Sequence, residues 1–371
     1  MSQTVFIYIV ITLLCVITTL MTPHYIFGRN TIRTNSIKYF TSCFIPIMIY
    51  SLFWGFRDNV GTDYPAYESM FYNIDSDNER IEPIYYFLNV FFREIGFSHV
   101  SIFILTSFIS IWSLFYIARY ESRTFACFLI YFFFTTSLVL FYQNGIRQSI
   151  AFSFLMILIS RIQDYKLWKL CLLGLMAWGF HKSSVVPLVI ILTLRIVPQI
   201  KINKYILIVI LIFLTFFGDQ LYSFIFSKFY FLFGLLGYTS YEENVDRFET
   251  SAELSSGLGL LLQLTINCLV IFNQEKYYQT NKKNPIYYFY LFYILGIMIN
   301  PIISGNSLMG RLNMYFISSK FIMYTYFCTF LTQQKKTSTI LTYFLVIMQI
   351  LLFIVALLGN SNDCVPYKAI I

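Results

Sequence analysis

The stretch TVFIYIVITLLCVITTLMT, residues 4–22, contains no charged side chain. A helix of this length is roughly 28 Å long, which matches the ~30 Å hydrocarbon core of a bilayer. No basic residue precedes residues 5–20, and the run shows no small-residue cleavage pattern. These features predict a first membrane span rather than a cleaved signal peptide.

The rest of the chain repeats this apolar pattern. Hydrophobic residues make up 58% of the chain and charged residues 12%, which excludes a soluble globular protein. Several of the apolar runs are shorter than ~20 residues, so tilt and snorkelling Lys or Arg must help them to span. The runs predict twelve spans, at 4–22, 39–56, 99–118, 125–142, 146–162, 166–180, 183–198, 204–220, 256–273, 285–303, 312–331 and 339–358.

The loops between these spans fall into two sets of opposite charge. One set carries 16 Lys or Arg against three acids, Glu121, Asp164 and Glu275, and therefore predicts the cytoplasmic face. The other face holds most of the acids, and its basic residues sit at the edges of apolar segments. The cytoplasmic set comprises 23–38, 119–124, 161–169, 195–204, 274–284 and 332–338.

Two further apolar stretches are not predicted to span. Residues 82–97, EPIYYFLNVFFREIGF, place a proline near a helix start and carry Arg93 and Glu94 within the run, which indicates an interfacial or re-entrant helix. Residues 220–238 surround Lys228, and a span there would move two basic loops outside. The charge pattern argues against it.

The sequence therefore predicts an all-α polytopic membrane protein with about twelve transmembrane helices plus interfacial or re-entrant helices. It forms one transmembrane domain over 1–371, with long outer loops at 57–98 and 218–255. We expect the first loop to be ordered and the second to form a partly membrane-embedded cap. The net charge of +8 comes from cytoplasmic anchors and is no argument for nucleic-acid binding. No C-x-x-C occurs, and we assign no metal or cofactor.

Polar groups with possible chemistry gather on the predicted outer face. Arg147 follows a Gln-Asn-Gly turn at the start of a span, and Arg311 follows a Gly-rich loop at another. His181 and Lys182 lie in the GFHKSS turn. For Arg147 the simpler interpretation is an interfacial snorkelling side chain, and for the His-Lys pair a plain turn. Exposure of Arg to lipid costs several kcal/mol, so a polar cavity is the alternative.

The first outer loop adds Arg57, Asp63, Glu82 and the triplet Asp75-Ser76-Asp77. A D-x-D triplet can hold a divalent metal on a sugar-nucleotide phosphate, but otherwise this one is a solvated acidic loop.

Arg57, Arg147, Lys182 and Arg311 could converge on one anion. The planar fork of Arg binds phosphate oxygens in pairs, and the doubly negative ligand expected at this depth is a lipid diphosphate. A transferase would need these cations to receive the diphosphate charge, and a base to activate an acceptor hydroxyl. His181 is the first candidate for the base, because histidine titrates near neutral pH, and Asp63 and Glu82 are the next.

The ordered motifs of the chain resemble those of a known family. The resemblance runs from about residue 50 to the C-terminus, and it is to the EpsG-like branch of the Wzy-type O-antigen and exopolysaccharide polymerases. The motifs are R-D-x-V-G-T-D-Y-x-x-Y (57–67), E-P-I-Y-Y (82–86), G-I-R-Q (145–148), H-K-S-S (181–184), G-R-L-N-M-Y (310–315) and V-P-Y-K (365–368).

The resemblance implies a glycosyltransferase C-like enzyme of the bacterial inner membrane. Such an enzyme polymerises undecaprenyl-diphosphate-linked oligosaccharide repeats at the periplasmic face, with one lipid-linked glycan as donor and another as acceptor. Its outer arginines correspond to Arg57, Arg147 and Arg311, and its His-Lys pair to His181 and Lys182. Membrane lipids and a chain-length regulator protein are the other partners it suggests.

Two other classes of protein remain open. A lipid-linked oligosaccharide flippase would show two related halves, often with broken helices, and no halves are visible in the sequence. A ligase or a lipid-phosphate-sugar-dependent glycosyltransferase would move glycan to a different acceptor. Metal dependence would separate such a transferase from the polymerase.

Overall fold

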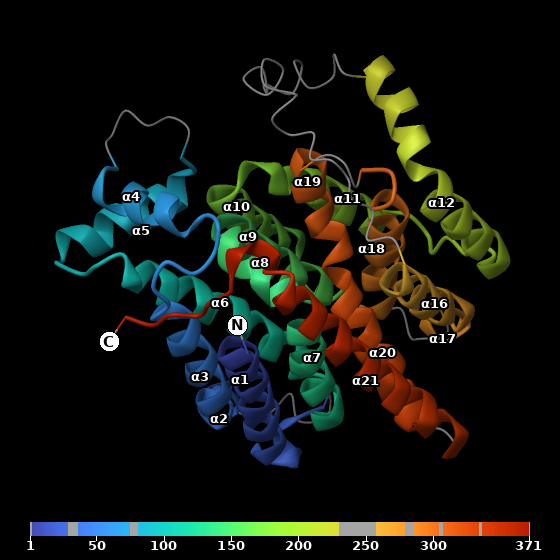
Figure 1. Cartoon of the computed structure of the whole chain (residues 1–371), viewed down its shortest axis with the longest axis horizontal. Coiled ribbons are helices and arrows are strands. Elements are labelled where there is room, and N and C mark those ends of the chain that lie inside the picture. The colour runs from blue at the N-terminus through green and yellow to red at the C-terminus, as the bar shows by residue number, and fades with distance from the viewer. Residues whose placement is uncertain are drawn as a thin grey trace. The chain divides into compact units, whose positions relative to one another are not determined.

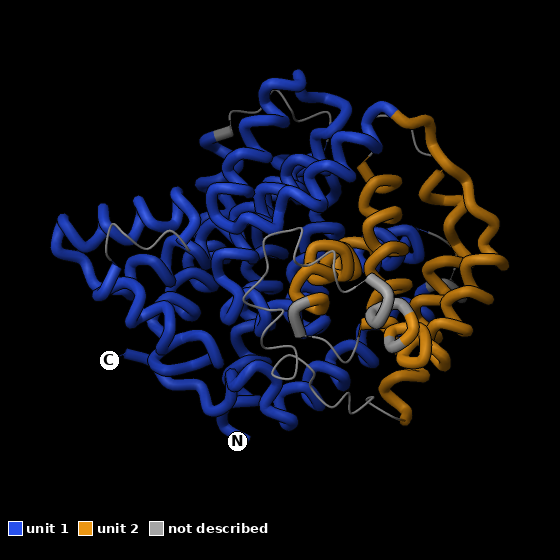
Figure 2. Tube along the Cα trace, turned by 90° about the horizontal axis from the view of Figure 1, so that it is seen from above, with its two compact units in different colours: residues 1–196, 324–371 blue, residues 197–323 orange. Residues whose placement is uncertain are grey.

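The computed structural model describes residues 2–28, 36–74, 81–229, 257–278, 285–303, 307–333 and 336–370. Every regular element in these ranges is a helix, as predicted. The chain divides into two compact units, shown in blue and orange in Figure 2. Unit 1 comprises Met1–Ile196 and Tyr324–Ile371, and unit 2 comprises Val197–Met323. Whether they form the single transmembrane domain expected from the sequence stays a prediction.

Unit 1 carries most of the helices. Figure 1 shows α1, α3 and α7 as neighbours, and α6 packs against both α3 and α9. Its helices are α1 (Ser2–Met21), α2 (Ser36–Ser42), α3 (Phe44–Gly55), α4 (Tyr64–Tyr72), α5 (Pro83–Glu94), α6 (Val100–Ala118), α7 (Arg123–Thr135), α8 (Leu138–Asn144), α9 (Ile146–Ser160), α10 (Leu167–Phe180), α11 (Val185–Ile196) and α21 (Lys336–Leu358). The short 3-10 turns η1 (His24–Ile26), η3 (Lys182–Ser184) and η4 (Ser361–Asp363) also belong to it.

The described helices of unit 2 are α12 (Lys204–Phe229), α16 (Leu258–Phe272), the short α17 (Glu275–Tyr278), α18 (Ile286–Ile299) and α19 (Ser307–Ile317). The boundary between the two units falls within α20 (Ser319–Thr332). Buried tyrosines pair with amides inside unit 2. Tyr290 donates to Gln274 at 2.7 Å, and Tyr293 donates to Asn267 at 2.8 Å. These bonds satisfy hydroxyls that would otherwise be costly to bury.

The count of twelve spans is not confirmed. Among the described residues, four helices are long and apolar enough to cross a membrane, namely Ser2–Met21, Val100–Ala118, Lys204–Tyr222 and Thr339–Leu358. The α7–α8 pair would be a fifth if its two bent halves form one span. Five further apolar helices, Phe44–Gly55, Ile146–Ser160, Leu167–Phe180, Leu258–Phe272 and Ile286–Ile299, are shorter. The coarser prediction of a helical protein with several apolar, span-like helices holds.

Three predicted spans are not continuous helices. Residues 125–142 bend by 66° between α7 and α8, where Ser137 adopts a left-handed φ of 62°. Thr135 and Thr136 donate to carbonyls of the preceding turn, which is how short polar side chains compete with a helix. Residues 39–56 break at Cys43, because Pro46 has no N–H to continue the ladder. Residues 312–331 are interrupted at Ser318.

Both long outer loops differ from simple connections. The first loop, 57–98, contains the helices α4 and α5 and is therefore ordered, as expected. Its residues 75–80 lie outside the described residues. The helix predicted to end at 220 continues to Phe229 as α12. Residues 230–256, the rest of the expected cap, lie outside the described residues.

Three basic segments of unit 1 are joined by direct contacts. Gly28 donates to the carbonyl of Arg119 at 3.1 Å. The guanidinium of Arg161 lies 3.1 Å from the centre of the Tyr120 ring, and Tyr116 is hydrogen-bonded to Tyr165. The end of segment 23–28 and the loop 161–169 therefore both lie beside the loop 119–124, while the assignment of these loops to the cytoplasmic face stays a prediction.

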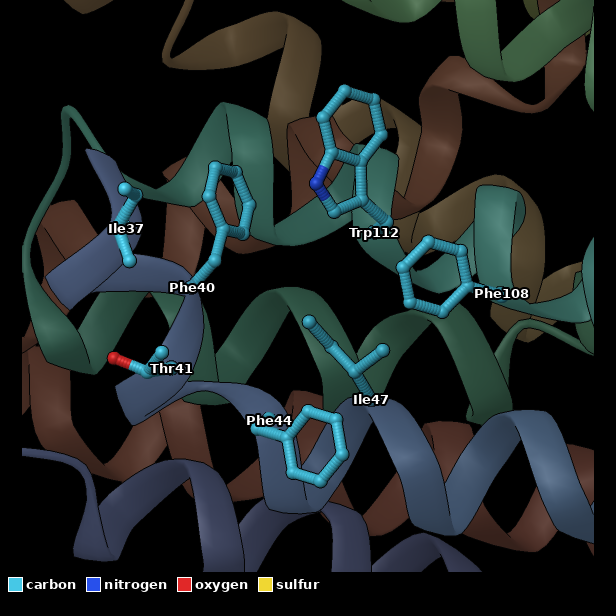
Figure 3. Close-up of a pocket in the computed structure, with 7 residues that line it drawn as sticks. All are labelled: Ile37, Phe40, Thr41, Phe44, Ile47, Phe108 and Trp112. Atoms are coloured by element: carbon cyan, nitrogen blue, oxygen red, sulfur yellow. The ribbon is translucent and has the colours of Figure 1, made fainter.

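An apolar cavity of about 450 Å³ lies between α2–α3 and α6 (Figure 3). Phe40 stacks on Trp112 at its wall, with ring centres 5.6 Å apart. The lining contains no titratable side chain and is made by Ile37, Phe40, Thr41, Phe44, Ile47, Phe108 and Trp112. The chemistry of the protein must therefore be sought elsewhere.

Candidate functional site

The site begins with Glu82, the residue before helix α5. Proline disfavours helical backbone in the residue that precedes it, and Glu82 is extended, with φ −67° and ψ 141°. Pro83 then starts the helix, where its missing N–H costs nothing. The E-P pair thus fixes where α5 starts and holds the Glu82 carboxylate at that end, where its side chain is only 5% exposed.

The Glu82 carboxylate joins three segments of the chain. Its Oε2 accepts from Nη1 of Arg147, on α9, at 2.6 Å. Its Oε1 lies 2.9 Å from Nδ1 of His181, which ends α10, and accepts the backbone N–H of Lys182 at 3.3 Å. Arg147 and His181 remain about a quarter exposed, at 24% and 27%. The structure therefore brings together four of the predicted site residues.

The charge of Glu82 determines which of these groups can act as a base. Burial by itself would raise the pKa of this carboxyl, but the hydrogen bond from His181 and the charge of Arg147 outweigh it and lower the pKa to about 2. Glu82 is therefore an ionised, doubly paired carboxylate near neutral pH and a poor base. As an anion it accepts a hydrogen bond from Nδ1–H of His181, so that in the neutral imidazole Nε2 carries the lone pair.

Nε2 of His181 has no hydrogen-bond partner among the described residues. A carboxylate that holds one imidazole nitrogen orients the ring and stabilises the imidazolium that forms when the other nitrogen takes a proton. The geometry is that expected of a general base at His181 with Glu82 orienting its ring, and both roles stay predictions.

Two aromatic residues that the sequence did not single out surround Arg147. Its guanidinium carbon lies 5.9 Å from the Tyr67 ring centre and 5.7 Å from the Tyr85 ring centre. Within the described part of the chain, Nε of Arg147 and the Tyr85 hydroxyl are buried without a hydrogen-bond partner. Tyr67 belongs to the D-Y-x-x-Y motif and Tyr85 to the E-P-I-Y-Y motif, and these motifs were the sequence signal that could have identified them.

Arg57 takes a different position from the one expected. It is fully buried. Nη1 donates to the Trp54 carbonyl at 2.7 Å and to the Gln143 side chain at 3.0 Å, while Nη2 donates to the Gln143 carbonyl at 3.0 Å. The guanidinium also lies 4.2 Å from the centre of the Phe103 ring. Arg57 has no exposed surface for a ligand in this conformation, so its assignment to a diphosphate site stays a prediction that this geometry does not support.

The other predicted residues are placed as follows. Asp63 precedes α4, and its backbone N–H donates to the side chain of Asn144 at 3.2 Å. Lys182 is exposed in η3, directly after His181. Arg311 lies on α19 in unit 2, and its convergence with Arg147 stays a prediction.

The metal interpretation of the sequence concerns the triplet Asp75-Ser76-Asp77. Asp75 and Asp77 lie outside the described residues. Within the described ranges, no group of three or more His, Cys, Asp or Glu side chains could hold a metal ion.

Comparison with known proteins agrees with the motif pattern. No curated protein and no solved structure matches the chain. The sequence model of the EpsG family matches residues 40–369, which include every residue of the site. The chain therefore belongs to the EpsG family, whose members are similar to the Wzy-type polysaccharide polymerases.

Proposed function

We propose that this protein polymerises lipid-diphosphate-linked oligosaccharide repeats at the outer face of the bacterial inner membrane. Undecaprenyl diphosphate is the carrier, and the growing glycan moves from it to a sugar hydroxyl of a second lipid-linked repeat. Membership of the EpsG family suggests a polymerase-like role. The observation that carries the proposed chemistry is the bridge from Glu82 to His181 and Arg147.

The reaction needs a base on one side and cations on the other. Nε2 of His181 takes the proton of the acceptor hydroxyl while the hydroxyl oxygen attacks the anomeric carbon of the donor glycan. The bond from that carbon to the diphosphate breaks, and the lipid diphosphate leaves with the bonding electrons. The proton on His181 then passes to solvent, so the products are the lengthened glycan and the lipid diphosphate.

Arg147 and Lys182 are placed to receive the charge of the leaving diphosphate. At rest the Arg147 charge is offset by Glu82, 2.6 Å away, while Lys182 adds a further cation, exposed in η3 directly after His181. Protonation of His181 adds one positive charge as the diphosphate departs. The charge on His181 appears only as the reaction proceeds, so it raises turnover rather than substrate binding.

The test uses purified protein in nanodiscs with a defined lipid-diphosphate-linked repeat, and a gel to resolve polymer length. General base catalysis contributes ~10²–10⁴-fold, so His181→Ala should cut turnover by about that factor while donor binding persists. His181→Gln cannot take the proton and should behave like His181→Ala. His24→Ala, at an exposed histidine in η1, is the matched control and should polymerise normally.

Wild-type turnover in both His181 variants would remove His181 as the base. Transbilayer movement of the lipid-linked repeat without any polymer would instead favour the flippase class. Loss of activity in a chelator would favour a metal-using transferase.

A further inference from the structure

The C-terminal segment 360–370 lies along the loop 56–63 that precedes α4. Backbone hydrogen bonds join the two segments from Asp58 to Lys368 (3.0 Å), from Gly61 to Asp363 (2.9 Å), from Thr62 to Asn362 (3.2 Å) and from Ile370 to Phe56 (2.7 Å). A side-chain bond from Thr62 to Asp363, at 3.0 Å, adds to them. We call segment 360–370 the C-terminal strap.

The strap is also attached to α1 and α3. Tyr8 donates to the Cys364 carbonyl at 2.7 Å. Tyr367 donates through its hydroxyl to the Phe53 carbonyl at 2.6 Å, and its ring stacks on that of Phe53 with centres 4.3 Å apart. Its backbone N–H donates to Thr4 at 3.2 Å. The V-P-Y-K motif therefore serves to dock the strap on the helices.

Asn144 connects the strap to the loop and to α8. Its Oδ1 accepts from the backbone of Asp63 at 3.2 Å, and its Nδ2 donates to the Asn362 carbonyl at 2.9 Å and to the Leu140 carbonyl at 3.3 Å. Gly61 has a φ of 105°, and a Cβ there would lie 2.7 Å from Oδ1. The buried amide thus uses both its donor and its acceptor, and only glycine fits against it.

We propose that Asn144 is a positioning residue for Arg147, and that the C-terminal strap holds Asn144 in place. Only Gly145 and Ile146 separate Asn144 from Arg147, so the start of α9 is held on one side by the Asn144 amide and on the other by the Glu82 contact. Release of the amide would let α9 shift and weaken the Arg147–Glu82 pair. This inference rests on the proposed function, because Arg147 is there assigned to the diphosphate.

The first test measures coupling between the two residues. A misplacement of about 1 Å can cost ~10²-fold, so Asn144→Ala should lower kcat/KM by about 10- to 100-fold. Asn144→Asp should do at least as much harm, because a carboxylate oxygen would face the Asn362 carbonyl. In an Arg147→Lys background, whose small residual turnover is followed at raised enzyme concentration, the further loss from Asn144→Ala should fall to less than about threefold. Asn73→Ala, at an exposed amide that donates to Ser69, is the control.

Equal losses from Asn144→Ala in both backgrounds would mean general destabilisation and would overturn the proposal. A second measurement does not depend on activity. Hydrogen exchange in peptides 57–67 and 141–150 should be faster in Asn144→Ala than in the wild type, since both segments lose their shared anchor. Unchanged exchange would overturn the proposal. If the wild type makes no polymer, the proposed function fails, and the exchange measurement alone decides whether Asn144 positions the start of α9.

Discussion

Replacement of Glu82 by Gln tests the charge at the centre of the site. The partners of Glu82 lower its pKa from 4.5 to about 2. Each pKa unit is worth about 1.4 kcal/mol, so this shift corresponds to about 3 kcal/mol of folding free energy. Because the pKa is lowered in the folded state, this stabilisation is fully present above about pH 4.5 and is lost as the pH falls toward about 2.

Glu82→Gln should therefore be less stable than the wild type at pH 6 by about 3 kcal/mol, and the difference should shrink as the pH falls below about 4.5. Gln keeps an acceptor for His181 but places an amide N–H₂ where Arg147 requires an anion. The assay is thermal unfolding of the purified protein in one detergent between pH 3 and pH 7. Glu94→Gln, at the other, exposed end of α5, is the control, and its effect should stay within about 0.5 kcal/mol.

A difference between wild type and Glu82→Gln that stays constant from pH 6 to pH 3 would refute this reasoning. It would mean that the substitution acts through packing rather than through the carboxylate charge.

Three further predictions concern Arg147, Arg57 and the membrane topology. Arg147→Ala should abolish polymer while single lipid-linked repeats and the protein level persist, and Arg147→Lys should restore little, because Lys lacks the planar fork; full-length polymer from Arg147→Ala would contradict the diphosphate role. Arg57→Ala should lower the yield of folded protein, measured by size-exclusion chromatography, because it removes a buried group that is hydrogen-bonded to Gln143. Normal yield with a raised KM would instead mean that Arg57 contacts the substrate. Reporter fusions should place loop 332–338 in the cytoplasm and 242–253 outside, and a cytoplasmic signal from 242–253 would overturn the charge-based topology.

The positions of most helices could be predicted from the sequence, because an apolar run and its flanking charges are local features. The start of α5 at the E-P pair and the start of α9 after the Q-N-G turn were both visible in this way. The pattern of hydrophobicity does not report where a helix bends. The bend between α7 and α8 occurs inside an apolar run, where Ser137 adopts a left-handed backbone conformation.

For the candidate site, the sequence supplied the residue types, and only the tertiary structure decided which of them meet. Glu82 lies 65 residues from Arg147 and 99 residues from His181, so no local pattern could show that one carboxylate holds both. Arg57 and Arg147 look alike in the sequence, as cations at the ends of apolar runs. The fold gives them different environments. Arg57 is buried and donates to the side-chain and backbone oxygens of Gln143, whereas Arg147 stays partly exposed beside Glu82. The physical reason is that burial and pairing are properties of the folded chain, and they set the charge that each group carries.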